Sequence, residues 1–311
     1  MTTIDLTDTS ASAVSSALIN ARRAAGNQAV GMVLTFVVVV DEATHYDAMR
    51  SALDAGREHP SRVLVVITRP GRGPARLDAE IRVADSRPGD TIVLRLFGEL
   101  AKHADSVVLP LLLPDTPVAV WWPSKAPPVP GEDPLGVLAQ RRITDSAASS
   151  QPIRALHQRA VSYQPGDTDL AWTRLTPWRA LLAAALDQMP GATVTAATVE
   201  AERSNPSAEI LGSWLGGRLG VEVTRRASSG PGITLVQMTT SGGPNIAPGD
   251  VVLSRPDGIL AQLDLPGGPI RPVALRRRET AELLAEELRR LDPDDVYATV
   301  IKGCAPVERS T

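Results

Sequence analysis

An apolar run of eleven residues, Val30 to Val40, constrains the fold of this chain more than any other stretch. It is interrupted only by Gly31 and Thr35 and ends in four consecutive valines. Crossing a bilayer takes about 20 apolar residues, so the run is too short for a membrane span. Dense β-branched residues on both faces are typical of a central strand that helices cover on each side. The run therefore predicts a buried strand of an α/β sheet.

A second buried strand follows after one helix. Asp41 is suited to cap a helix that ends near Ala55, and residues 62–68 read Arg-Val-Leu-Val-Val-Ile-Thr. Strand, helix and strand in this order predict a βαβ unit. The same layered sheet accommodates a helix over 11–25, strands at 80–84 and 91–96, apolar segments at 106–113 and 117–122, and a short helix over 134–144. We predict a Rossmann-like α/β domain over residues 1–150, with a mostly parallel sheet.

The remainder of the chain indicates a second domain of α+β type. Residues 151–192 predict a connecting helical segment, in which Thr176 and Pro177 suit the first positions of a helix and Pro190 its end. The domain at 193–311 is expected to hold strands at 193–201 and 221–225, a helix at 205–219, an antiparallel meander at 233–240, 250–254 and 259–263, a helix at 280–291 and a strand at 295–302.

Length and charge limit the classes of function. With 311 residues the chain is long enough for two domains. Its net charge of −3 gives no basic footprint, so nucleic acid is not expected as a partner. No secretion signal or membrane-spanning run is visible, which predicts a cytoplasmic protein without membrane association. Cys304 is the single cysteine, which excludes an internal disulfide but not an intermolecular one.

The residue patterns of catalysis and cofactor binding are missing from the sequence. The four histidines lack metal-ligand spacing, and no cysteine or acidic cluster completes a site. Gly71-Arg72-Gly73 is followed by Pro74 instead of the glycine-opened helix of a dinucleotide loop. The run Arg276-Arg277-Arg278 could meet phosphate, but three arginines before a helix are more often a solvated face. We therefore expect no catalytic residue, no metal and no cofactor.

A cluster of tryptophan and arginine stands out between the two predicted domains. Trp172, Arg174, Trp178 and Arg179 lie within eight positions, in a protein with only 3% aromatic residues. Trp and Arg are enriched at binding hot spots. A Trp at the start of an amphipathic helix is more often part of a core, so Trp178 is expected inside, and Trp172 with Arg174 exposed. A third interpretation makes the cluster a staple between the domains, with arginines bound to carboxylates such as Asp169.

Several stretches together resemble the glucose-6-phosphate dehydrogenase assembly protein family, OpcA. The resemblance spans nearly the whole chain and is carried by residues 169–179, 134–136, 139–145, Trp121-Trp122-Pro123, 21–24, 30–34 and 283–288. It implies a non-enzymatic cytoplasmic protein that binds glucose-6-phosphate dehydrogenase and assembles or allosterically activates it, at the entrance of the oxidative pentose phosphate pathway. A small-molecule effector is not identified by the resemblance.

Two functional hypotheses follow. The first is a binding protein for the dehydrogenase, with one partner surface that comprises Trp121, Trp122, Arg141, Arg142, Trp172, Arg174, Trp178 and Arg179. The second is a sugar-phosphate or nucleotide sensor, or an enzyme, that uses the first α/β domain. Such a site needs arginines and backbone amides at strand ends, which residues 69–76 could supply.

Overall fold

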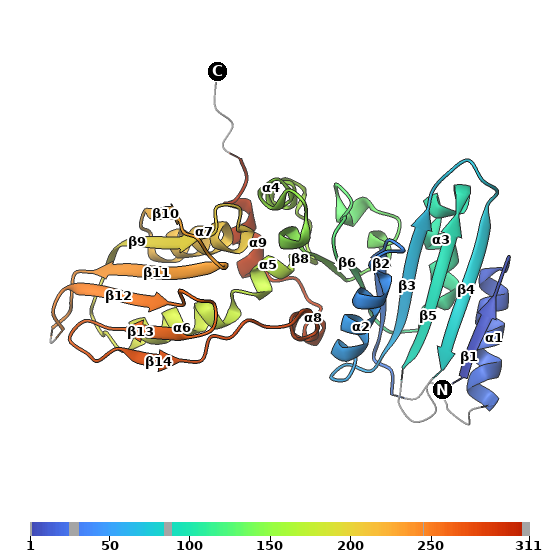
Figure 1. The fold of residues 1–311 in the computed structure, drawn as a ribbon, viewed down its shortest axis with the longest axis horizontal. Helices are drawn as coiled ribbons and strands as arrows, with labels where there is room; N and C mark the ends of the chain where they lie inside the picture. Colours follow the sequence, from blue (N-terminus) through green and yellow to red (C-terminus); the bar gives the residue numbers. More distant parts are fainter. Residues whose placement is uncertain (1, 25–30, 84–88, 245, 307–311) are drawn as a thin grey trace, which may run out of the picture. The chain divides into compact units, whose positions relative to one another are not determined.

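The computed structural model describes residues 2–24, 31–83, 89–244 and 246–306 (Figure 1). These residues form two compact units, and neither unit is one continuous stretch of sequence. The first unit contains residues 1–145, 164–168 and 280–294, and the second contains 146–163, 169–279 and 295–311. Each unit has its own sheet and its own helices, so each is described by itself.

The first unit is built on an eight-stranded sheet of order β1-β4-β5-β3-β2-β6-β7-β8. The central strands β5, β3, β2, β6 and β7 run parallel, while β4 runs antiparallel to its two neighbours, β5 and β1. The predicted mostly parallel α/β sheet is thus confirmed. The strands are β1 (Thr2–Leu6), β2 (Leu34–Val40), β3 (Ser61–Arg69), β4 (Arg76–Val83), β5 (Asp90–Phe97), β6 (Val118–Trp122), β7 (Arg141–Thr144) and β8 (Asp167–Asp169).

Helices cover this sheet because its central strands are apolar on both faces. Residues 61–67 of β3 are all buried. On one face, Leu64 and Val66 pack with Val14 of α1 (Ala11–Ala24) and Val107 of α3 (Ala104–Val108). Helix α2 (His45–Ala55) contacts β2 and β3 and also packs against α8 (Thr280–Arg289). Residues 25 and 30, the limits of one predicted helix and one predicted strand, lie outside the described residues.

The second unit contains a six-stranded sheet of order β10-β9-β11-β12-β13-β14. Only β9 and β10 are parallel, and the meander from β11 to β14 is antiparallel. Its strands are β9 (Val194–Ala201), β10 (Val223–Ala227), β11 (Ile233–Thr240), β12 (Gly249–Ser254), β13 (Ala261–Asp264) and β14 (Arg271–Val273). Its helices are α4 (Pro152–Ser162), α5 (Leu170–Thr173), α6 (Thr176–Asp187), α7 (Pro206–Leu219) and α9 (Asp295–Lys302).

Three sequence predictions are wrong in this fold. Residues 134–144 form a 3₁₀ turn at Gly136–Leu138 and then strand β7, not a short helix. Residues 295–302 form helix α9 instead of a strand, and the buried Tyr297, Val300 and Ile301 recur at helical spacing. The helix at 280–289 is present, but it belongs to the first unit and not to the C-terminal one.

Candidate functional site

The Trp/Arg cluster is preceded in sequence by a fully buried carboxylate, that of Asp169. Asp169 caps α5, and its side chain accepts a hydrogen bond from the backbone N–H of Ala171 at 2.9 Å. The hydroxyl of Ser146 donates to the same carboxylate at 2.6 Å, and the Ser146 backbone N–H donates at 3.0 Å. A capping aspartate satisfies helix donors that would otherwise lack partners. Asp169 therefore fixes the start of the cluster in the second unit.

The two tryptophans that follow are core residues of the second unit. Trp172 is 2% exposed and its ring lies 5.8 Å from that of Tyr297. The guanidinium carbon of Arg179 lies 3.5 Å from the centre of the Trp172 ring, a cation–π contact. The expectation that Trp172 is exposed is wrong, because α9 and Arg179 cover it. The expected burial of Trp178 is confirmed, at 3% exposure.

The four other candidate residues are buried in the first unit. Trp121 and Trp122 belong to the fully buried strand β6, and Trp121 stacks on Phe36 with ring centres 6.3 Å apart. Arg141 donates through Nη2 to Glu287 at 2.5 Å and through Nη1 to the Asp292 carbonyl. The Nε of Arg142 donates to Asp167 at 2.5 Å and its Nη1 to the Ala139 carbonyl. Sequence patterns gave no sign that these arginines would be internal ion-pair partners.

The eight candidate residues are thus divided between the two units. Four belong to the first unit and four to the second. Within the second unit, Arg174 and Arg179 are half-buried while both tryptophans are buried. The hypothesis that these eight residues contact a partner stays a prediction, and the two arginines are the members of this group that keep access to solvent there.

A cavity of about 280 Å³ in the second unit gathers five arginines. One is Arg174 of the cluster, another is Arg255 after β12, and three are consecutive residues before α8. The only acidic residue among the lining residues is Glu202. The lining consists of Ala147, Arg174, Leu175, Pro177, Trp178, Glu202, Asn205, Ser207, Gly232, Ile233, Arg255, Arg276, Arg277 and Arg278. The basic run that the sequence favoured as a solvated face therefore borders a concave site.

Arg255 is the buried member of this group. It is 6% exposed, its guanidinium carbon lies 5.1 Å from the Trp178 ring centre, and its Nη1 donates to the Leu275 carbonyl at 2.6 Å. Its Nε has no hydrogen-bond partner among the described residues. Burial lowers the pKa of this guanidinium below its ordinary value, and the positive charge of Arg277 lowers it further. Only the nearby Asp257 charge acts to raise that pKa.

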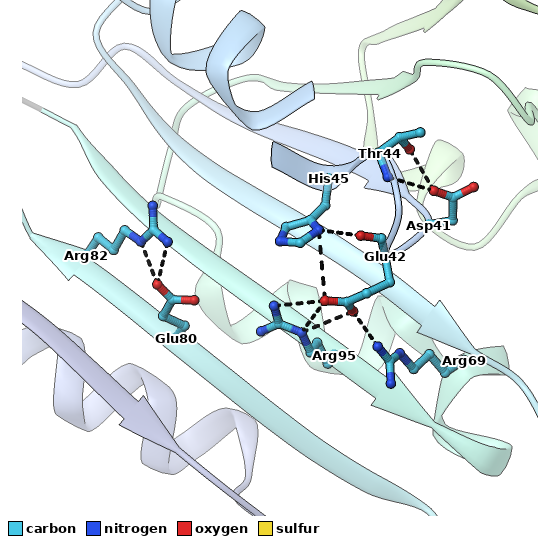
Figure 2. A network of polar contacts seen from close by, with 8 residues as sticks. All are labelled: Asp41, Glu42, Thr44, His45, Arg69, Glu80, Arg82 and Arg95. Atoms are coloured by element: carbon cyan, nitrogen blue, oxygen red, sulfur yellow. Dashed lines mark hydrogen bonds and ion pairs between the residues drawn. The ribbon is translucent and has the colours of Figure 1, made fainter. Parts of the chain in front are cut away.

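The carboxyl ends of the first unit's strands hold a different polar network (Figure 2). Glu42, just after β2, accepts hydrogen bonds from Arg95 at 3.1 Å and forms an ion pair with Arg69 at 2.9 Å. Burial raises the pKa of Glu42, but the hydrogen bonds and charges of Arg95 and Arg69 outweigh this and leave the pKa below its ordinary value. Arg76 pairs with Asp78 at 3.0 Å. Two of the three arginines in residues 69–76, Arg69 and Arg76, are thus paired with carboxylates.

The described residues contain neither a candidate metal cluster nor a candidate membrane span. Among residues 2–24, 31–83, 89–244 and 246–306, no group of three or more His, Cys, Asp or Glu side chains is placed to hold a metal ion. Within the same ranges, none of the helices has the length and apolar character that a membrane span requires.

Two protein-family models match the chain in succession. The model described as the glucose-6-phosphate dehydrogenase subunit N-terminal domain matches residues 52–161. The model described as the C-terminal domain of the same subunit matches residues 165–301. The two matches together cover most of the chain. No curated protein matches the sequence.

Solved structures resemble the chain only distantly. A 3-ketoreductase from Actinomadura kijaniata, KijD10 in complex with NADP, aligns with a TM-score of 0.43 at 9% identity, covering 88% of this chain and 95% of that one. An oxidoreductase from Sinorhizobium meliloti aligns with a TM-score of 0.30 at 11% identity, covering 87% of each chain. Likenesses this weak support no statement about cofactor or substrate.

Proposed function

The chain belongs to the family of glucose-6-phosphate dehydrogenase subunits, and from this we propose that it binds that enzyme as a non-catalytic assembly factor or allosteric activator. The observation that carries the proposal is the match of both subunit domains, in order, along one chain. Such a subunit supports the oxidative pentose phosphate pathway through its effect on the partner, and the partner supplies the chemistry.

The engagement of the buried charged side chains in ion pairs and hydrogen bonds supports a non-catalytic role. Catalytic acids and bases are held in clefts with altered pKa values, whereas structural ion pairs are engaged inside the protein. In the first unit Arg141 pairs with Glu287, and Arg142 with Asp167. In the second, Asp169 is occupied by Ser146 and the α5 backbone. These groups hold loops and helix ends in place and are not presented to a substrate.

We assign the eight candidate residues two kinds of role in binding the dehydrogenase. The buried tryptophans and the Arg141 and Arg142 ion pairs act as supports that set the shape of each unit. Arg174 and Arg179, which keep partial access to solvent, are proposed to contact the partner directly. Arginines at the centre of an interface contribute through bidentate hydrogen bonds to carboxylates.

A kinetic titration tests this proposal. The dehydrogenase of the same organism is assayed with increasing amounts of the purified chain, and kcat and KM are followed. We expect a saturable change in one or both. Arg174→Gln should weaken the apparent affinity about tenfold or more, as expected for loss of a charge-assisted contact. The control is Arg226→Gln, an exposed arginine of the same unit that pairs loosely with Glu200 at 3.8 Å.

One outcome would contradict the partnership with the dehydrogenase, and another would contradict only the role of Arg174 in it. Unchanged kinetics together with no co-elution of the two proteins would remove the partnership itself. Equal affinity for the Arg174→Gln and Arg226→Gln variants would leave the partnership in place but exclude Arg174 from the contact. Trp172→Ala distinguishes support from contact, because a buried tryptophan should lower the melting temperature strongly when it is truncated.

The alternative of a sugar-phosphate or nucleotide site in the first α/β domain has weaker support. It relied on residues 69–76, but Arg69 is bound to Glu42 and Arg76 to Asp78. An anion bound by Arg69 or Arg76 would have to displace these carboxylates. The test is to measure the melting temperatures of the parent and of an Arg69→Gln variant with and without NADP or ATP. A ligand that raises the melting temperature of the parent but not of the variant would favour the alternative.

A further inference from the structure

We propose that the arginine-lined cavity of the second unit binds the phosphate group of a small molecule. The cavity lies within one unit and shares Arg174 and Trp178 with the proposed partner surface, but phosphate binding to it can be measured without the dehydrogenase. It is carried by the charge of the lining, by the buried Arg255 and by the way in which the backbone accommodates Arg277.

The residues that line the cavity include more positive than negative side chains. Five arginine side chains line it, and Glu202 is the single carboxylate in the lining. Like charges brought together in a partly desolvated space repel one another, and a bound anion removes that repulsion. Arg255 adds a second observation that favours a bound anion, because it is buried and its Nε lacks a hydrogen-bond partner among the described residues. A buried donor without a partner costs stability unless a ligand or water occupies it.

The arginines are also held in defined places. Nη2 of Arg278 donates to the carbonyl of Thr173. Arg277 lies against two glycines with positive φ: a Cβ on Gly232 would lie 3.0 Å from its Nη2, and a Cβ on Gly258 would lie 3.3 Å from its Nε. Side chains at these two positions would crowd the guanidinium. The Arg277 guanidinium thus lies close to the backbone at both glycines, whose positive φ also favours glycine.

The amino-terminal end of α7 adds to the positive electrostatic potential of the cavity. Asn205 and Ser207, at the first turn of this 14-residue helix, both line the cavity. The amino-terminal end of a helix carries a partial positive charge that favours phosphate. Asn205 also accepts a hydrogen bond from Ala208 at 3.0 Å, so the turn is fixed in its capped conformation.

The dimensions favour a small phosphate compound. A volume of about 280 Å³ is just below the range of small-molecule pockets, which runs from roughly 300 to 1,000 Å³. Trp178, Leu175 and Ile233 add an apolar wall that could contact the organic part of such a ligand. A phosphate dianion carries more charge and more oxygens than a single carboxylate, so several guanidinium groups can bind it at once.

Calorimetric titration of the full chain at constant ionic strength tests the inference. The probes are inorganic phosphate, glucose 6-phosphate, glucose and succinate, with no dehydrogenase present. We expect saturable binding of a phosphate probe with a Kd below about 1 mM. Equal affinity for the two phosphate probes identifies inorganic phosphate as the ligand, and tighter binding of glucose 6-phosphate identifies a phosphomonoester.

Two charge-matched variants accompany the titration. Arg277→Gln removes an exposed guanidinium of the cavity, and we expect phosphate affinity to fall about tenfold or more with an unchanged melting temperature. Arg218→Gln removes an exposed arginine near the opposite end of α7 and should bind like the parent. Arg255 is not the primary variant, because its buried packing on Trp178 could affect folding.

Any of three results would overturn the inference. The first is no saturable binding of either phosphate probe up to about 20 mM, far above the expected Kd. The second is equal affinity of the Arg277→Gln and Arg218→Gln variants for phosphate. The third is succinate binding as tightly as phosphate, which would point to a carboxylate ligand such as an acidic segment of a protein. Failure here leaves the proposed dehydrogenase partnership untouched, because the assay does not contain that enzyme.

Discussion

The ion pair between Arg141 and Glu287 joins strand β7 to helix α8 across a long separation in sequence, and both side chains are about 95% buried. We expect Glu287→Gln to lower the free energy of unfolding by about 3 kcal/mol, because it leaves a buried guanidinium without its carboxylate. Urea denaturation of the full chain measures the change. The matched control is Arg289→Gln on the same helix, whose pair with Glu58 is exposed and worth at most about 1 kcal/mol. Equal losses in the two variants would contradict the prediction.

Cys304 offers a second residue-scale prediction. Burial raises the pKa of its thiol to about 11 from an ordinary 9.0, and a hydrogen bond with Ser213 offsets only part of this. Because the thiolate is the reactive form, we expect alkylation by iodoacetamide at about pH 8 to be about 100-fold slower in the folded protein than in concentrated urea. The folded rate should rise with pH well beyond pH 9. Similar rates in both states would show that the thiol is accessible and available for intermolecular disulfides.

At the scale of elements, α7 combines a structural cap with a wall of the arginine cavity. Asn205→Ala should destabilise the protein by about 1 kcal/mol through loss of the cap. Asn205→Asp retains a capping oxygen, so stability should stay near that of the parent while the added negative charge weakens phosphate binding. Denaturation and calorimetry on both variants separate these effects. Parent-like phosphate affinity of Asn205→Asp would place the anion away from this turn.

The elements that sequence patterns predicted are those with local signals. Helix α7 begins at a capping asparagine and ends at Gly220 in the left-handed conformation, and both signals are legible in the sequence. Helix α9 is short and rich in β-branched residues, which favoured a strand until its burial at helical spacing was seen. Trp172 was expected to be exposed because Tyr297, which covers it, lies far along the chain, where no local sequence pattern reports the contact. Arg179, seven residues further on, adds a cation–π contact to the Trp172 ring.

At the scale of the whole molecule, the two α/β units and the parallel character of the first sheet follow from apolar periodicity. The interleaving of the two units in sequence does not, because α8 joins the first unit through tertiary contacts, among them those with α2, Arg141 and Glu58. The arginine cavity could not be predicted from the sequence either. Its arginines come from three separate segments, and only the fold of the second unit gathers them. Motifs spread over the chain were sufficient to predict the family. They do not locate the surface that binds the partner.

The central claim is that this chain forms a complex with glucose-6-phosphate dehydrogenase. The most direct measurement is size-exclusion chromatography with light scattering on an equimolar mixture, at micromolar concentrations, with each protein run alone for reference. We expect a new peak that contains both chains and whose mass is a whole-number combination of the two. Two separate peaks with the masses of the free proteins, at every concentration up to about 100 μM, would contradict it, because a stable subunit should associate well below that level.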